Sequence, residues 1–103
     1  MGKDKLRRFR ENLTFDCFVQ PEFDEVFHCD HPLKGRWRSD FFRNDNPIVL
    51  ELGCGKGEYT VALAEHDPSR NYIGIDIKGA RMWRGAKSVT ERKIANAGFL
   101  RTR

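Results

Sequence analysis

Two acids and three alternating glycines are the residues of this sequence whose types and spacing could bind a ligand. Glu51 lies two positions before Gly53, and Gly55 and Gly57 follow at every second residue. Asp76 ends the next apolar run. Glycines allow a ligand to approach the backbone closely, and an acid after the second strand of a nucleotide-binding sheet can accept hydrogen bonds from ribose hydroxyls. The pattern therefore predicts a site for a nucleoside-containing cofactor.

The segments around the glycines predict the elements that position them. Residues 48–52 form an apolar run of strand length, residues 58–66 have helical spacing before an Asp-Pro stop, and residues 71–76 form a second buried-strand candidate. Strand, glycine loop, helix, strand and acid make up the first part of a doubly wound nucleotide-binding sheet. We therefore predict an α/β fold of the Rossmann-like class.

The glycine spacing distinguishes between two kinds of cofactor. A dinucleotide fingerprint needs a small residue three positions after its second glycine. This chain has Glu58 there, and its carboxylate would repel a pyrophosphate; the third glycine comes one position earlier, at Gly57. An acid two positions before G-x-G-x-G instead resembles motif I of the class I S-adenosylmethionine-dependent methyltransferases. That cofactor has no phosphate and carries a sulfonium and an ammonium group, which acids suit.

This resemblance implies a role for each residue of the pattern. Gly53, Gly55 and Gly57 would underlie the methionine half of S-adenosyl-L-methionine, and Glu51 would lie near its methionine end. Asp76 would bind the ribose, and the neighbouring Ile77 would lie beside the adenine. The alternative is a glycine-rich turn in an unrelated α/β protein.

Charge is distributed in blocks along the chain, which has a formal net charge of +4. Residues 1–10 carry five bases and one acid, residues 11–33 carry six acids and no Lys or Arg, and residues 77–103 carry eight bases and one acid. The blocks fit a polyanion-binding face on a protein that also holds a cationic cofactor; ordinary solvated surface is the alternative. We expect residues 1–10 to form a flexible basic arm unless an anion orders them.

Four bases are candidate RNA contacts. A long helix is predicted over residues 79–97, with one apolar face, with Arg81 and Arg84 mostly on the other face, and with Gly98 as its stop. Lys34 and Arg36 flank a glycine just before a tryptophan, which could contact RNA or be buried as a core residue. Residues 100–103 resemble the lead into a third strand.

The chain divides at the turn-rich segment before residue 47. We predict a basic and aromatic N-terminal extension over residues 1–46, and the amino-terminal half of an S-adenosylmethionine-binding domain over residues 47–103. Parallel strands are buried on both faces, so the two or three expected strands cannot complete a core. We therefore expect the chain to be a piece of a longer protein and to be inactive alone.

Four segments together indicate a narrower family. K-G-R-W at residues 34–37, N-D-N-P at 44–47, L-E-L-G-C-G-K-G at 50–57 and Y-I-G-I-D at 72–76 resemble, in order, the amino-terminal part of bacterial tRNA (guanine-N7-)-methyltransferases. The resemblance implies methylation of N7 of a guanine in the variable loop of tRNA. It also implies that the acid beside the target base lies beyond residue 103, so the catalytic residues are unknown. The alternatives are a methyltransferase acting on a small molecule or protein, and an inert nucleic-acid-binding module.

Other signals bear on metal, membrane and compartment. Three cysteines without a framework pattern favour reduced thiols. The histidines and cysteine of residues 28–31, with Cys17 upstream, lack zinc-finger spacing, so we expect no metal site. No apolar run could span a membrane, and the N-terminus does not resemble a signal peptide. We therefore expect a cytoplasmic protein whose oligomeric state the sequence leaves open.

Overall fold

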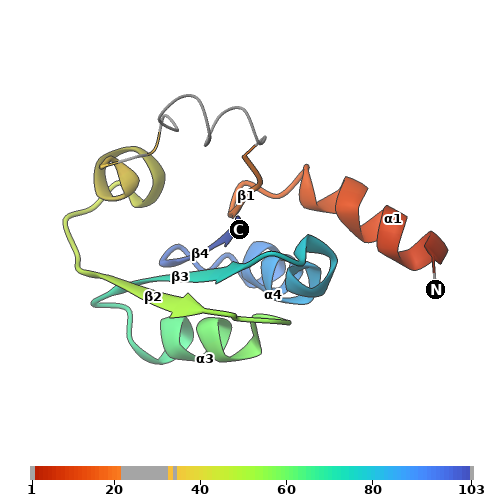
Figure 1. Cartoon of the computed structure of the whole chain (residues 1–103). Helices are drawn as coiled ribbons and strands as arrows, with labels where there is room; N and C mark the ends of the chain where they lie inside the picture. Colours follow the sequence, from red (N-terminus) through yellow and green to blue (C-terminus); the bar gives the residue numbers. More distant parts are fainter. Residues whose placement is uncertain (1, 22–32, 34, 103) are drawn as a thin grey trace.

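A parallel sheet organises the computed structural model, which describes residues 2–21, 33 and 35–102 (Figure 1). In chain order the elements are α1 (Gly2–Asn12), β1 (Phe18–Val19), the π-helix η1 (Trp37–Phe42), β2 (Ile48–Leu52), α3 (Glu58–His66), β3 (Asn71–Asp76), α4 (Gly79–Arg92) and β4 (Ala97–Arg101). The strands lie in the order β1-β4-β3-β2, and every pair is parallel. The predicted α/β class with a parallel sheet is thus confirmed.

The two crossover helices build the hydrophobic core on one face of the sheet. Phe99 of β4 and Met82 and Ala86 of α4 are each 0% exposed. A Cβ atom added at Gly57, Gly74 or Gly85 would lie between 2.5 and 2.9 Å from a carbon of the Phe99 ring. The helices can therefore approach the sheet closely only because glycine faces the ring at all three positions. On the other side of the sheet lies η1 (Figure 1).

Helix α4 ends earlier than the sequence pattern predicted. The expected helix over residues 79–97 stops at Arg92, and Lys93 adopts a left-handed conformation with φ 54° and ψ 47°. The side-chain amide of Asn96 then donates to the carbonyls of Ala64 and Arg70, at 2.9 Å each. These distant contacts fix the loop after α4. The expected stop at residue 98 is wrong, because Gly98 lies within β4.

The basic N-terminal segment is a helix, which corrects the expectation of a flexible arm. Helix α1 packs against α4 (Figure 1). The buried Asn12 donates its side-chain amide to the carbonyl of Gly79 at 2.9 Å. The short strand β1 also pairs with β4. Residues before position 47 therefore contribute to the sheet and the helical layer, while the division into two domains at that position stays a prediction.

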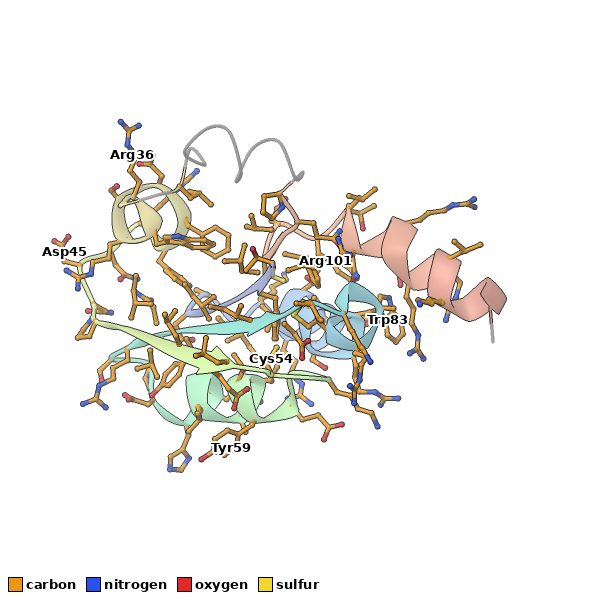
Figure 2. All side chains as sticks on the ribbon, in the orientation of Figure 1. Arg36, Asp45, Cys54, Tyr59, Trp83 and Arg101 are labelled. Carbon is orange, nitrogen blue, oxygen red and sulfur yellow. The ribbon has the colours of Figure 1, made fainter. Side chains whose placement is uncertain are left out.

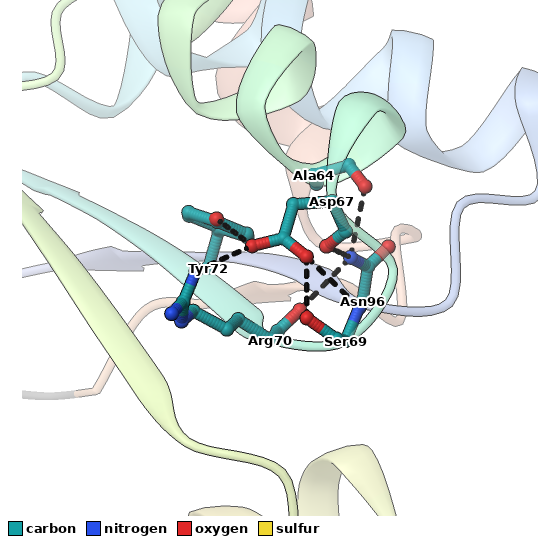
Figure 3. Close-up of polar contacts among 6 residues, drawn as sticks. All are labelled: Ala64, Asp67, Ser69, Arg70, Tyr72 and Asn96. Carbon is teal, nitrogen blue, oxygen red and sulfur yellow. Dashed lines mark hydrogen bonds and ion pairs between the residues drawn. The ribbon is translucent and has the colours of Figure 1, made fainter.

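A polar turn joins α3 to β3 (Figure 3). The Asp67 carboxylate accepts hydrogen bonds from the Ser69 hydroxyl, from the Tyr72 hydroxyl at 2.8 Å and from Arg70 at 2.9 Å. The bonds from Ser69 and Tyr72 are the main reasons why the pKa of Asp67 lies well below its usual range. Helix α3 ends at His66, as the Asp-Pro pair predicted. The turn fixes where β3 begins.

The N-D-N-P segment is fixed at the same, amino-terminal end of β2 and β3 by amide side chains. Asn71 is 0% exposed and donates to the side chain of Asn44 at 2.8 Å and to the carbonyl of Asn46 at 3.2 Å. These bonds satisfy a buried polar group. They also set the register in which β2 starts beside β3, with Ile48 opposite Asn71.

Candidate cofactor site

The loop between β2 and α3 exposes its backbone at two of the three predicted glycines. Gly53 and Gly55 have φ angles of 69° and 57°, and no heavy atom of the described residues beyond the chain neighbours lies within 4 Å of a Cβ built at either position. The loop rests on β3, because the amides of Gly53 and Cys54 donate to the carbonyl of Ile75 at 2.7 and 3.1 Å. Left-handed glycines and open space together make a surface that a ligand can approach at backbone distance.

Gly57 has a different local environment. It is buried at the N-terminus of α3 with φ 77°, and a Cβ atom there would lie 2.5 Å from the Phe99 ring. Its backbone angle and its packing against β4 both require glycine. This requirement exists without any ligand, so the expected place of Gly57 under the methionine half stays a prediction.

Asp76 lies at the carboxyl end of β3, and its side chain reaches across to the glycine loop. One carboxylate oxygen accepts from the Gly55 amide at 2.9 Å, and the other accepts from the amides of Ile77 at 2.7 Å and Lys78 at 3.3 Å. Burial raises the pKa of Asp76, but these bonds and the charge of Arg81 outweigh it, so the net pKa is lowered. The group is therefore a carboxylate at neutral pH. A carboxylate has about four acceptor positions, which leaves capacity for a ligand hydroxyl.

Glu51 approaches the same loop from β2. Its carboxylate accepts a hydrogen bond of 2.6 Å from the hydroxyl of Thr60, a residue of α3 that is 1% exposed. The Cys54 thiol (Figure 2) lies close enough to both acids to respond to their charge. Burial, then Asp76, then Glu51 raise the pKa of Cys54 to about 12. Both acids thus act on the same loop, and Cys54 stays a neutral thiol at neutral pH.

The charge of this arrangement suits the predicted cofactor. Two carboxylates near one open glycine backbone favour a ligand that carries positive charge. Ile77 follows Asp76 directly and is 53% exposed, so an apolar side chain is available beside the acid. Glu51, Gly53, Gly55 and Asp76 are the residues that could hold S-adenosyl-L-methionine, and Ile77 could cover its adenine.

Sequence reasoning missed two residues at this site. Thr60 holds Glu51, and nothing in the sequence around it indicates that contact. Arg101 pairs in register with Asp76 and donates from its Nε to the carbonyl of Ile77 at 3.1 Å. The parallel pairing of β4 with β3 places Arg101 opposite Asp76. That pairing was not predicted, because the third strand was expected only from residue 100.

The three described residues among the four predicted RNA contacts, Arg36, Arg81 and Arg84, do not form one patch. Arg36 is exposed on η1 and lies 3.9 Å from the carboxylate of Asp40. Figure 2 shows it at the opposite end of the molecule from Trp83 of α4. Arg81 and Arg84 are exposed on α4, where Arg81 lies near Asp76. Lys34 lies outside the described residues.

A shallow groove of about 270 Å³ separates α3 from α4. Arg84 lines it together with Glu58, Glu65 and Arg92. Arg92 and Glu65 form an ion pair at 2.6 Å across it. The groove therefore carries both signs of charge, and it is separate from the open glycine loop.

Residues 2–21, 33 and 35–102 contain no group of three or more His, Cys, Asp or Glu side chains placed to hold a metal ion. Residues 28–31, which the sequence analysis considered for zinc, lie outside these ranges. None of the described helices has the length and apolar character needed to cross a bilayer.

Comparison with known proteins shows the family to which the chain belongs. Residues 45–102 match the family model described as putative methyltransferase. The chain is 57% identical to a tRNA (guanine-N(7)-)-methyltransferase of Christiangramia forsetii over 98% of this chain and 45% of that protein. A protein of the same name from Bacteroides fragilis is 47% identical over 99% of this chain and 40% of its own length. A third, from Porphyromonas gingivalis, is 65% identical over 69% of this chain and 29% of its own length. The chain thus spans less than half the length of these relatives, and the resemblance predicted from its motifs is confirmed.

Proposed function

The chain belongs to the putative methyltransferase family, and on that premise we propose that the protein methylates N7 of a guanine in tRNA with S-adenosyl-L-methionine. The product would be 7-methylguanosine in the variable loop. The observation that carries this proposal is the 57% identity, over 98% of the chain, to a protein named tRNA (guanine-N(7)-)-methyltransferase. Because the substrate is tRNA, the reaction would take place in the cytoplasm.

The proposed chemistry needs little from the protein beyond positioning. S-adenosyl-L-methionine, when bound, supplies an electrophilic methyl group on a sulfonium. N7 of guanine has an in-plane lone pair and no proton, so its attack requires no general base. The N7–carbon bond forms as the sulfur–carbon bond breaks, the electron pair returns to sulfur, and the positive charge passes to the purine. Holding the two reactants in line should supply most of the acceleration.

The described residues would orient the methyl donor and stabilise its positive charge. Asp76 would accept a ribose hydroxyl while its bonds to the Gly55 and Ile77 amides keep the carboxylate in place. Glu51, held by Thr60, would lie near the cationic methionine end. Open space above Gly53 and Gly55 would let that end lie against the backbone.

Access to N7 sets the form of the RNA substrate. The major groove of A-form RNA is too deep and narrow for side chains to reach N7. The target guanine would therefore be turned out of a loop, which agrees with a variable-loop target. Basic surface beside the site would hold phosphates, so RNA affinity would fall steeply as salt rises.

A direct assay separates this function from its alternatives. Full-length protein is incubated with isotopically labelled S-adenosyl-L-methionine and unfractionated tRNA, and the digested RNA is examined by mass spectrometry. Labelled 7-methylguanosine is expected, and its position is mapped to the variable loop. Cofactor binding without RNA methylation would favour a small-molecule or protein substrate. Absence of cofactor binding by calorimetry would favour an inert RNA-binding module. The isolated 103-residue chain is expected to give no product.

A further inference from the structure

Three cations surround one tryptophan where α1 crosses α4. The guanidinium carbons of Arg7 and Arg8 lie 5.5 and 4.6 Å from the ring centroid of Trp83, and Nζ of Lys87 lies 4.8 Å from it. We call Arg7, Arg8 and Lys87 the cation cluster. Figure 2 shows Trp83 between the two helices. Two of the cluster's residues come from the segment expected to be a flexible arm, so only the folded structure brings the cluster together.

Among the described residues, the three cations of the cluster share the Trp83 ring with one acid, Glu11. The indole N–H of Trp83 donates to the carboxylate of Glu11, the acid that shares this contact. Each cation gains from the face of the ring, but like charges gathered around one ring repel one another. The Nε atom of Arg8 is buried and has no hydrogen-bond partner among the described residues. That atom is itself covered, but Arg8 and Lys87 are only half-buried and carry further N–H donors, which suit an anionic oxygen.

We propose that the cation cluster binds the phosphate backbone of the RNA substrate. The contacts of Trp83 hold α1 against α4 and so keep the cluster together. The proposal rests on the proposed function for the identity of the RNA. Trp83 is only 9% exposed, so its ring is not available to stack on a base. Recognition at this place is therefore electrostatic and independent of base sequence. The ring serves to hold three cations in fixed positions.

The position of the cluster relates RNA binding to the candidate cofactor site. Helix α4 begins at Gly79, three residues after Asp76, and α1 is joined to that same point by the bond from Asn12 to the Gly79 carbonyl. At 1.5 Å per residue, Trp83 and Lys87 lie roughly 6 and 12 Å along the helix axis from Gly79. Phosphates held by the cluster would therefore lie beside the carboxyl edge of β3, from which Asp76 reaches the glycine loop.

The test compares two variants of the full-length protein that lose the same charge from the same helix. Arg7→Gln/Arg8→Gln removes two members of the cluster. Lys5→Gln/Arg10→Gln removes two exposed bases of α1 that are not members of the cluster. Binding of unfractionated tRNA is measured as a function of salt. The first variant should lose about tenfold or more in affinity at 0.1 M salt, and its slope of log K against log salt should be shallower by about 2.

The control variant should lose clearly less in both quantities. Lys87→Gln gives an independent arm, because Lys87 belongs to α4 and its substitution leaves the sequence of α1 unchanged; its slope should be shallower by about 1. Equal losses of tRNA affinity in the two double variants would show that net charge alone determines binding, which would overturn the proposal. Wild-type tRNA affinity in Arg7→Gln/Arg8→Gln would also overturn it. Unchanged tRNA binding together with lost binding to phosphatidylserine vesicles would overturn it in favour of a membrane surface.

Cofactor binding and methylation keep this proposal distinct from the proposed function. All three variants should bind S-adenosyl-L-methionine with the wild-type dissociation constant. A wild-type protein that binds tRNA through the cluster but never methylates it would overturn the function and leave the cluster's role standing. If Arg7→Gln/Arg8→Gln methylates tRNA with the wild-type KM, the role of the cluster in RNA binding is contradicted and the proposed function is supported.

Discussion

At the scale of single residues, Asp76 bears most on the candidate site. It joins the end of β3 to the glycine loop through Gly55, and it presents its remaining acceptor capacity to the space above that loop. Asp76→Ala in the full-length protein should weaken S-adenosyl-L-methionine binding by about 1–3 kcal/mol, or roughly 5- to 150-fold, because ribose hydroxyls would lose their acceptor. Isothermal titration measures this, with the exposed Asp45→Ala as control. An unchanged dissociation constant for Asp76→Ala would remove Asp76 from the site.

Cys54 gives a second test that needs no activity. Because burial and the two acids raise the pKa of its thiol to about 12, the reactive thiolate is scarce at neutral pH. Its alkylation by iodoacetamide should be far slower at pH 8 than that of glutathione. The rate should still rise about tenfold per pH unit near pH 10, where a thiol with an ordinary pKa of about 8.5 has levelled off. Peptide mass spectrometry follows the site. A rate at Cys54 that levels off near pH 9 would contradict the burial of this thiol beside the two acids.

At the scale of elements, the contact between α4 and β4 depends on one glycine that no motif indicated. A Cβ atom at Gly85 would lie 2.6 Å from the Phe99 ring and 2.9 Å from the backbone oxygen of Lys56. Gly85→Ala should therefore lower the free energy of unfolding by about 1–3 kcal/mol, the usual cost of overpacking. Ser88→Ala, on the same helix at the surface groove, should change it by less than about 0.5 kcal/mol. Urea denaturation of both variants measures the difference.

The origin of that cost is tested by a double substitution. Phe99→Leu removes ring atoms that an alanine at position 85 would meet. If the clash with the ring causes the loss, Gly85→Ala should cost less in the Phe99→Leu background than in the wild type, and the cycle gives the coupling energy. Additive losses would assign the effect to the Lys56 backbone instead.

Some of the elements could be predicted from the sequence, and others could not. Strands β2 and β3 and the loop between them were predicted, because an apolar run, alternating glycines and an acid are local signals. The end of α4 was not, because no glycine or proline marks it and Lys93 takes its left-handed conformation where Asn96 bonds to the distant Ala64 carbonyl. Helix α1 was missed for the same reason, since its position depends on tertiary contacts to α4. In the site, the contact of Thr60 with Glu51 could not be predicted from spacing.

At the scale of the whole molecule, the two faces of the sheet are unequally covered. Helices α3 and α4 cover one face, whereas Leu50 and Leu52 of β2 are 56% and 76% exposed. Alternate residues of a strand share a face, so these two leucines form an apolar surface on the strand at the edge of the described sheet. Parallel sheets are normally covered on both faces. In the isolated 103-residue chain this surface should therefore bind hydrophobic dye and promote association.

Two lysine substitutions of equal exposure test this surface. Leu52 and Leu13 are each 76% exposed, but Leu13 follows α1 and belongs to no strand. In the 103-residue chain, Leu52→Lys should lower the fluorescence of a bound naphthalene-sulfonate dye and the light scattering at high concentration, because a charge on an edge strand opposes pairing. Leu13→Lys adds the same charge and should change both signals much less. Equal reductions would show that added charge, and not the uncovered sheet face, governs association. A monodisperse wild-type chain that binds no dye would show that this face is covered within the chain itself.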